Sequence, residues 1–214
     1  MPKALVPLGP RPLVAWSLIA LASCDRVDGI VLAAPPGQET PMRMAVGEAG
    51  GESLVVVSGG ATRQRSVAAA LAAVPGEATE ILVHDGARPL LTPRLIEAVL
   101  DGLQGTEGAI AATPVADTLK QGDDDMIITG TVDRAGLWRA ETPQAFHADV
   151  LRRAFDLADD ETLDTATDCA SMVEALGGRV RLVASGAPNL KVTTPADLAV
   201  AEQMLDVTGG SFRG

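Results

Sequence analysis

Short, uninterrupted apolar runs recur along this chain of 214 residues, and stretches with helical periodicity separate them. The runs are rich in Val, Ile and Leu and lack the apolar–polar alternation of a half-exposed strand, so each strand should be covered on both faces. The expected strands are residues 29–33, 54–57, 81–83, 108–113 and 180–184. The expected helices are residues 13–21, 63–74, 93–103, 149–157, 168–176 and 195–204. This alternation predicts an α/β fold with a doubly wound, mostly parallel sheet.

One segment, residues 114–139, breaks the alternation. Two pieces rich in Thr, Val and Ile flank the polar turn at residues 122–125, which predicts a β-hairpin arm that leaves the sheet. Because an isolated two-stranded arm is only marginally stable in water, we expect it to pack on a second subunit. Residues 1–207, including this arm, are expected to form one domain, and the Gly-rich residues 208–214 a flexible tail.

The charge balance narrows the possible partners. The chain holds 17 basic and 28 acidic residues, a formal net charge of −11, and only 2% aromatic residues. An acidic surface repels phosphodiester backbones, and few rings are available to stack on bases, so we expect no nucleic-acid partner. Apolar stretches shorter than a membrane span, the lack of a visible leader and two widely spaced cysteines together predict a cytoplasmic protein with reduced thiols.

Ligands of such sheets bind beyond the carboxyl ends of the strands, and the loop at residues 58–66 is one candidate. Gly59 and Gly60 permit a tight turn, and the helix that follows offers free N–H groups to an anion. Arg63, Arg65 and Ser66 lie in its first turns, where positive charge costs stability unless an anion is bound. An ordinary strand-to-helix turn with solvated arginines is an equally good interpretation.

A second candidate loop follows the run at residues 81–83. Asp85 there suits Mg²⁺, which prefers carboxylate and phosphate oxygens, and Arg88 suits a phosphate. His84 is a possible base, but strand alternation points it away from Asp85 and favours a structural role. His147 precedes a helix and is interpreted as a surface residue.

The third candidate loop, residues 186–193, contains Lys191, one of three lysines in the chain. Taken alone, Lys191 is better interpreted as a surface ion-pair residue. No Ser/His/Asp set, paired Cys cluster or dinucleotide-binding G-x-G-x-x-G motif is present. The Gly-rich, locally cationic loops with one well-placed Asp therefore favour phosphate chemistry, in which positioning and charge neutralisation carry most of the catalysis.

Seven spaced segments together resemble the 2-C-methyl-D-erythritol 4-phosphate cytidylyltransferases of the non-mevalonate isoprenoid pathway. In order along the chain they are Pro2-Lys3 and residues 59–67, 85–89, 131–134, 142–144, 167–168 and 191–193. The resemblance covers essentially the whole chain and implies a Rossmann-like nucleotidyltransferase sheet and an arm-exchanged homodimer. The implied reaction joins CTP to methylerythritol phosphate and releases pyrophosphate.

The same resemblance implies a role for each matching residue. Lys3 would neutralise the CTP triphosphate, Gly60 and Ser66 would hold the cytidine, and Asp85 would bind Mg²⁺ beside Gly86 at the reacting centre. A further set would hold methylerythritol phosphate: Arg88, Thr142, Thr167 and Lys191. Thr118 and Arg134 on the arm would reach the site of the partner subunit, and the catalytic cations would be Lys3, Arg134 and Lys191.

The sequence departs from the family pattern at two places, and each departure leads to an expectation. Members have a strand and a G-x-G-x-R-x-G loop before the Pro-Lys pair, whereas this sequence begins at Met1-Pro2-Lys3. About 15–25 residues are therefore expected to be missing from the sequence, and a chain without them should show a gap in its sheet and poor activity. Ala187-Pro188 also stands where relatives often place a second metal-binding Asp, which leaves Asp85 as the protein carboxylate on the metal.

Two alternatives remain open at the level of sequence. A ribitol-5-phosphate cytidylyltransferase of the same fold would share nearly all of these motifs. A catalytically inactive dimer that binds nucleotides or polyol phosphates is a rival of a different class. Pyrophosphate release with a panel of polyol phosphates separates the three hypotheses.

Overall fold

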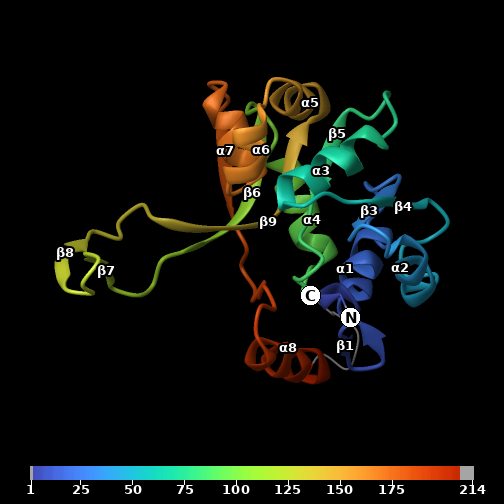
Figure 1. Cartoon of the computed structure of the whole chain (residues 1–214), viewed down its shortest axis with the longest axis horizontal. Helices are drawn as coiled ribbons and strands as arrows, with labels where there is room; N and C mark the ends of the chain where they lie inside the picture. Colours follow the sequence, from blue (N-terminus) through green and yellow to red (C-terminus); the bar gives the residue numbers. More distant parts are fainter. Residues whose placement is uncertain (1, 208–214) are drawn as a thin grey trace.

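The computed structural model describes residues 2–207, and a four-stranded sheet with the strand order β10-β6-β9-β5 lies at its centre (Figure 1). The strands are β5 (Glu80–Val83), β6 (Gly108–Pro114), β9 (Trp138–His147) and β10 (Val180–Ala184). β10 runs parallel to β6, with Val180 opposite Gly108 and Ala184 opposite Ala112. β5, β6 and β10 coincide with apolar runs of the sequence, so the expected α/β fold is confirmed.

β9 is antiparallel to both of its neighbours, which makes this sheet mixed. The sequence did not predict β9, because residues 138–147 contain Arg, Glu, Pro, Gln and His in place of a β-branched run. The register with β6 shifts between Ile110 and Ala112, so residues 141–143 lie opposite the single residue Ala111. Irregularities of this kind re-aim side chains, and Thr142 from this part of β9 reaches the loop after β5.

A second sheet consists of β3 (Ile30–Ala34) and β4 (Leu54–Ser58), which pair in parallel. Within residues 2–207 this pair forms no hydrogen-bonded ladder with β5. A cavity of about 930 Å³ separates them, lined by β3, by β5 and by the facing sides of helices α1 (Leu13–Ala22) and α3 (Arg63–Ala72). The sheet therefore has a gap of the kind expected from the family pattern, and the facing edges of β3 and β5 have no ladder partner in the described chain.

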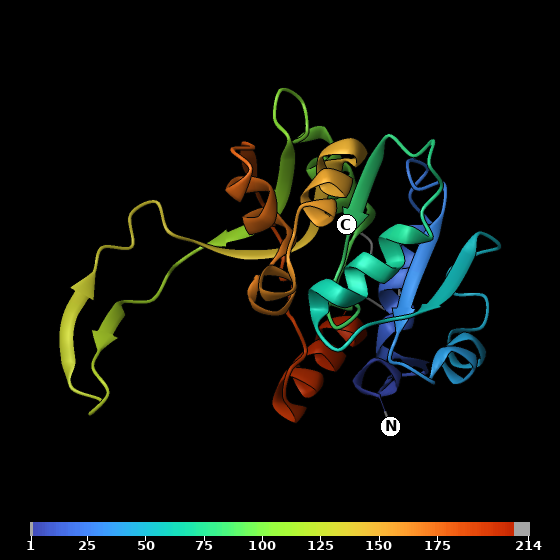
Figure 2. The same cartoon turned by 45° about the horizontal axis from the view of Figure 1, so that its top comes forward.

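Helices cover both faces of the central sheet (Figure 2). On one face, Ala109, Ala111 and Ala145 pack against α1 and α4 (Pro93–Asp101). On the other face, Ile110 and Phe146 pack against α3, α5 (Ala148–Asp156) and α7 (Cys169–Ala175). The small alanines on the first face allow close approach of α4, whereas the fully buried Phe146 fills the second.

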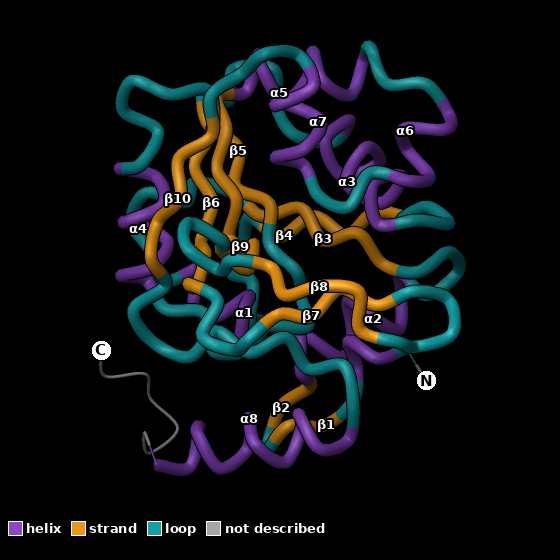
Figure 3. The backbone as a smooth tube through the Cα atoms, turned by 90° about the vertical axis from the view of Figure 1, so that its left-hand side faces the viewer, coloured by secondary structure: helices purple, strands orange, loops and turns teal. Residues whose placement is uncertain are grey.

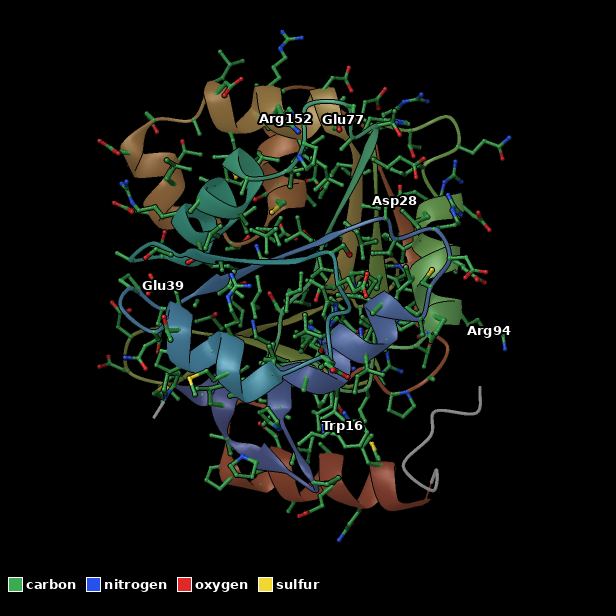
Figure 4. The ribbon with its side chains drawn as sticks, turned by 90° about the vertical axis from the view of Figure 1, so that its right-hand side faces the viewer. Trp16, Asp28, Glu39, Glu77, Arg94 and Arg152 are labelled. Atoms are coloured by element: carbon green, nitrogen blue, oxygen red, sulfur yellow. The ribbon has the colours of Figure 1, made fainter. Side chains whose placement is uncertain are left out.

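The ends of the described chain form a small outer layer (Figure 4). A short helix η1 (Lys3–Leu5) and the hairpin of β1 (Pro7–Leu8) and β2 (Arg11–Pro12) precede α1. β1 packs on α8 (Pro195–Val207), η1 contacts α1, and the Trp16 indole N–H of α1 donates to the Leu8 carbonyl at 3.0 Å. Thr194 caps α8, since its hydroxyl accepts from the Asp197 N–H at 3.2 Å.

The segment expected to form an arm contains the hairpin of β7 (Leu119–Gly122) and β8 (Ile128–Val132). In Figures 1 and 2 this hairpin lies at the end of two long connections, well away from the central sheet. In Figure 3, β7 and β8 run across the picture in front of the body. The turn and the first residue of β8 expose large apolar side chains: Met126, Ile127 and Ile128.

Two further helices were not predicted. α2 (Glu39–Val46) holds Pro41 and ends at a glycine, and α6 (Asp160–Thr165) is a short acidic helix capped by Asp159. Among the helices of residues 2–207, none combines the length and the apolar character that crossing a membrane requires. The predicted flexible tail, residues 208–214, lies outside the described residues.

Candidate active site

Asp85 stands in the loop directly after β5, and three cationic side chains from residues 2–207 face its carboxylate. The Arg63 Nε, from the first turn of α3, lies 2.9 Å from Oδ1. The Lys191 Nζ, from the loop before α8, lies 2.9 Å from Oδ2, and the Arg88 Nε lies 3.8 Å from the same oxygen. Three segments far apart in sequence thus meet at the carboxyl end of β5.

The cations keep Asp85 ionised. Burial alone would raise the pKa of this carboxyl, but the charge of Arg63 and the hydrogen bonds from Lys191 and Arg63 outweigh burial and lower the pKa to about 2. Three positive charges against one negative charge leave the cluster net cationic on a chain of net charge −11. Such a cluster attracts anions. Lys191, with 42% of its side chain exposed, is the most accessible of the three to a ligand.

The Gly-rich loop between β4 and α3 is held by Ser66. The Ser66 hydroxyl oxygen accepts from the Gly60 N–H at 3.1 Å, and the hydroxyl lies 2.9 Å from the Thr62 carbonyl. A Cβ on Gly60 would stand 2.4 Å from the Arg65 Cβ, and one on Gly59 would stand 3.0 Å from the Ala34 carbonyl oxygen. Both positions therefore require glycine for close packing of backbone on backbone.

The two arginines of this helix end have different partners. Arg65 pairs with α6, its Nε 2.7 Å from Asp164 and its Nη2 2.9 Å from Asp160. Hydrogen bonds to Asp164 and Asp160 raise the pKa of Arg65. Arg63 turns instead to Asp85. Neither is a freely solvated arginine, and of the two only Arg63 belongs to the cationic cluster.

His84 and Thr142 connect the loop after β5 to β9. The Asp85 N–H donates to the Thr142 hydroxyl oxygen at 3.0 Å, and that oxygen lies 3.2 Å from the His84 Nδ1. The His84 Nε2 lies 3.2 Å from the Arg88 carbonyl. Burial lowers the pKa of His84 to about 4, so the ring is neutral near pH 7. These contacts are those of a structural histidine, the role that the sequence favoured.

A buried glutamate outside the predicted site residues positions the loop that carries Lys191. The Glu141 carboxylate accepts from the hydroxyls of Thr113 and Ser185, each at 2.8 Å, and from the Asn189 amide at 3.0 Å. The Asn189 carbonyl in turn accepts from the Arg88 Nη1 at 2.6 Å. No local pattern marks Glu141, because its partners lie on other strands and loops.

Most of the predicted site residues lie in one region of the fold. Lys3, Ser66, Asp85 and Gly86 line the 930 Å³ cavity. Arg88, Lys191 and Thr142 contact Asp85 directly, and Gly60 is bound to Ser66. A Cβ on Gly86 would stand 2.9 Å from the Val14 Cγ2, which explains a glycine beside Asp85.

The remaining predicted residues are placed elsewhere. Thr118 and Arg134 lie on the arm with exposed side chains, and the Arg134 guanidinium donates to the Ala116 carbonyl. Thr167 is exposed just before Asp168, which caps α7 by accepting from the Ser171 N–H at 2.9 Å. Gln144 of β9 ties this cap to the sheet, since its Nε2 donates to the Asp168 Oδ2 at 2.8 Å.

The side chains at the cationic cluster show which kind of divalent metal site is possible there. Among residues 2–207, no group of three or more His, Cys, Asp and Glu side chains is close enough to hold an ion. Asp85 is the ionised carboxylate that the three cations face, and its Oδ2 is paired to the partly exposed Lys191. Mg²⁺ commonly takes one or two carboxylates and completes its shell with water and substrate phosphates. The residues therefore fit an ion that arrives with phosphates.

Comparison with known proteins gives a consistent result. The model of the IspD family, 2-C-methyl-D-erythritol 4-phosphate cytidylyltransferase, matches residues 1–207. A protein of that name from Parasynechococcus marenigrum is 41% identical over 203 residues, 95% of this chain and 89% of the relative. One from Azoarcus is 41% identical over 209 residues, 96% of this chain and 86% of the relative.

Solved structures agree with the sequence relatives. The crystal structure of 2-C-methyl-D-erythritol 4-phosphate cytidylyltransferase from Thermus thermophilus is 36% identical and superimposes with a TM-score of 0.81, covering 96% of this chain and 94% of that one. A structure of 4-diphosphocytidyl-2C-methyl-D-erythritol synthase gives a TM-score of 0.82 at 34% identity, covering 95% and 94%. With whole-length similarity in both sequence and fold, the chain belongs to the 2-C-methyl-D-erythritol 4-phosphate cytidylyltransferase family.

Proposed function

We propose that this chain is a cytidylyltransferase that joins CTP and 2-C-methyl-D-erythritol 4-phosphate. The products are 4-diphosphocytidyl-2-C-methyl-D-erythritol and pyrophosphate, and the reaction serves isoprenoid precursor synthesis in the cytoplasm. The family match supports the activity, and the observation that carries it is the cluster of Arg63, Arg88 and Lys191 around Asp85 at the carboxyl end of β5. Two phosphate-bearing reactants repel each other, and a net cationic cluster offsets that repulsion.

The chemical step is an in-line displacement. A phosphate oxygen of methylerythritol phosphate forms a bond to the α-phosphorus of CTP, and the bond from that phosphorus to the bridging oxygen of pyrophosphate breaks. Lys3 and Lys191 neutralise charge that moves onto the leaving pyrophosphate and the attacking phosphate, and Arg88 holds the latter. Gly60 and Ser66 hold the cytidine beside the N-terminus of α3, where free N–H groups favour polar ligands.

We propose Mg²⁺ as the divalent ion, with Asp85 as its protein ligand at the reacting centre next to Gly86. The ion would supply charge neutralisation on phosphate oxygens. Lys191 is exposed enough to leave the Asp85 Oδ2 when the phosphates bind, which frees that oxygen. Thr142, beside Asp85, and Thr167, before α7, would complete the contacts to methylerythritol phosphate.

The protein is further proposed to act as a homodimer through the arm of residues 114–139. Large apolar side chains are exposed along it, including Ile127 at 63% and Trp138 at 36%, and such surfaces favour burial against a partner. The distance of the hairpin from the body in Figure 1 suits exchange between subunits. Thr118 and Arg134 would then enter the partner's site, with Arg134 as a catalytic cation.

Residues 1–207 are proposed to form a single nucleotidyltransferase domain of the doubly wound, Rossmann-like type. The helices on both faces of the sheet support it, as do the parallel pairs β3–β4 and β6–β10. β9 is the antiparallel strand of that arrangement.

Pyrophosphate release tests the proposal. Purified protein with CTP, Mg²⁺ and methylerythritol phosphate should release pyrophosphate, and ribitol 5-phosphate should replace methylerythritol phosphate poorly. Turnover with ribitol 5-phosphate alone would reassign the substrate. Binding of CTP with no release under either condition would show an inactive nucleotide-binding dimer. Omission of Mg²⁺ with excess chelator should abolish release.

A further inference from the structure

Three hydrogen bonds beside the cationic cluster link four polar groups into one directed chain. It runs from the Asp85 N–H to the Thr142 hydroxyl, from there to the His84 Nδ1, and from the His84 Nε2 to the Arg88 carbonyl. A backbone N–H can only donate and a carbonyl can only accept, so the two ends set the direction of every bond between them. The His84 Nε2 must therefore carry the ring proton.

The same constraint governs Thr142. In the neutral ring the Nδ1 has a lone pair, so the Thr142 hydroxyl must donate its single proton to His84. The hydroxyl oxygen also accepts from the Asp85 N–H at 3.0 Å. One lone pair is then left, and no proton remains for a ligand. Thr142 is 3% exposed, which leaves the hydroxyl little freedom to choose other partners.

We propose that His84 is a positioning residue that makes the Thr142 hydroxyl a pure hydrogen-bond acceptor, so that Thr142 receives an alcohol hydroxyl of the bound polyol phosphate and not a phosphate oxygen. This rests on the function proposed above. A phosphate oxygen placed against the remaining lone pair could not form a hydrogen bond with it, because both oxygens are acceptors. Each would also lose the hydrogen bonds that water supplies.

The groups around Thr142 are likewise either hydrogen-bond acceptors or cationic donors. Asp85 is ionised and, like Thr142, can only accept, and its backbone N–H is bound to the Thr142 oxygen. The donors toward a ligand are the side chains of Arg63, Arg88 and Lys191. The remaining acceptor of Thr142 suits a hydroxyl of the polyol, whereas the cations suit its phosphate. Hydroxyl recognition of this kind rejects analogues that lack the hydroxyl, because the buried acceptor is left unpaired.

A spectroscopic measurement tests the hydrogen-bond chain without any turnover. The chain has two histidines, His84 and His147, so nitrogen NMR of the imidazole rings is readily assigned with the variant His147→Gln. At pH 7.5 we expect His84 to be neutral with the proton on Nε2. A neutral ring with its proton on Nδ1 would overturn the proposal, because Thr142 would then keep its own proton for the ligand.

Kinetics test the consequence for substrate recognition. Thr142→Val and His84→Phe should each raise KM for methylerythritol phosphate about tenfold, the effect of one lost hydrogen bond, and leave KM for CTP within about twofold. The double variant should be no worse than either single variant, since both changes remove the same interaction. Thr142→Ser keeps a hydroxyl and His84→Asn keeps an acceptor, so both variants should have a KM for methylerythritol phosphate close to that of the unaltered protein.

Substrate analogues identify the group that Thr142 receives. Polyol phosphates that each lack one hydroxyl are compared with the full substrate. With the unaltered protein, one of them should have a kcat/KM about tenfold lower than the full substrate. With Thr142→Val, the same analogue and the full substrate should have equal kcat/KM. Equal losses with both proteins for every analogue, or a rise in KM for CTP as large as that for the polyol phosphate, would refute the assignment. An unaltered protein without turnover would instead remove the proposed function, and the NMR result would still decide the tautomer.

Discussion

Lys191 has the most exposed side chain of the three cations at Asp85. Its substitution should therefore lower activity much more than stability. Lys191→Ala should lower kcat by about a hundredfold or more, because a positive charge at the reacting phosphates is lost. The midpoint of thermal unfolding should change little, since a half-exposed ion pair contributes little and Asp85 keeps Arg63. Pyrophosphate release and thermal unfolding measure the two effects.

Two variants serve as controls for Lys191. Lys191→Arg keeps the charge and should retain part of the activity, although guanidinium and ammonium are not equivalent at a phosphate. Arg94→Ala removes a cation that projects outward from α4 in Figure 4, and it should leave turnover unchanged. Full activity of Lys191→Ala would contradict its assignment to the site.

His84 makes the stability of the protein depend on pH. Its pKa is about 4 in the folded chain and near 6.5 when unfolded, so the unfolded state binds more protons between these values. The free energy of unfolding should therefore fall as pH drops from about 6.5 to 4, by on the order of 2–3 kcal/mol. Asp85, with a lowered pKa of about 2, loses its contribution only below about pH 4.

Urea titrations at a series of pH values measure this dependence. His84→Phe should flatten the curve between pH 6.5 and 4. The same slope in His84→Phe as in the unaltered protein would place the titrating group elsewhere.

At the scale of elements, the turn between β4 and α3 has no room for a side chain at Gly60. Gly60→Ala would set a methyl group 2.4 Å from the Arg65 Cβ, so the start of α3 must shift with Ser66 and Arg63. We expect about 1–3 kcal/mol of destabilisation together with a raised KM for CTP. Gly76→Ala, where a Cβ meets no atom within 4 Å, is the matched control, and equal effects in both would exclude this steric explanation.

The edges of β3 and β5 face the 930 Å³ cavity. Their backbone amides should therefore be less protected from hydrogen exchange than those of β6. β6 pairs on both sides, with β9 and β10, whereas β3 pairs with β4 and β5 with β9 in the described chain. Amides of β3 and β5 should exchange with deuterium faster than those of β6, since about half of them lack a ladder partner. Hydrogen exchange followed by mass spectrometry measures this, and equal protection would show that these edges are covered.

At the scale of the whole molecule, the proposed dimer places residues from two subunits in each site. Asp85→Asn and Arg134→Ala should each be nearly inactive alone. Mixed in equal amounts after subunit exchange, they should regain about a quarter of full activity, because half of the dimers are mixed and each of those has one intact site. Sedimentation gives the oligomeric state, and a mixture as inactive as its components would place Asp85 and Arg134 in the site of the same subunit.

Local sequence patterns predicted three of the central strands and most helices, because an element's periodicity reflects its own burial. The starts of four predicted helices, at residues 13, 63, 93 and 195, match the structure, whereas the C-terminal ends differ by one to three residues, as expected where helices fray. β9 escaped detection since its polar residues are buried by partners: Glu141 by Thr113, Ser185 and Asn189, and Gln144 by Asp168. No window of sequence around β9 contains those partners.

By itself the sequence determined the α/β alternation, the loops at strand ends in which the site lies, and the family, because each depends on residues close together or on motifs in fixed order. Only the tertiary structure decided which charges meet: Arg63 rather than Arg65 at Asp85, and Lys191 as its partner across 106 positions. It also decided the direction of the hydrogen bonds through His84 and Thr142. Ion pairs and hydrogen bonds act over a few ångströms, so their partners are known only once the chain has brought distant segments together.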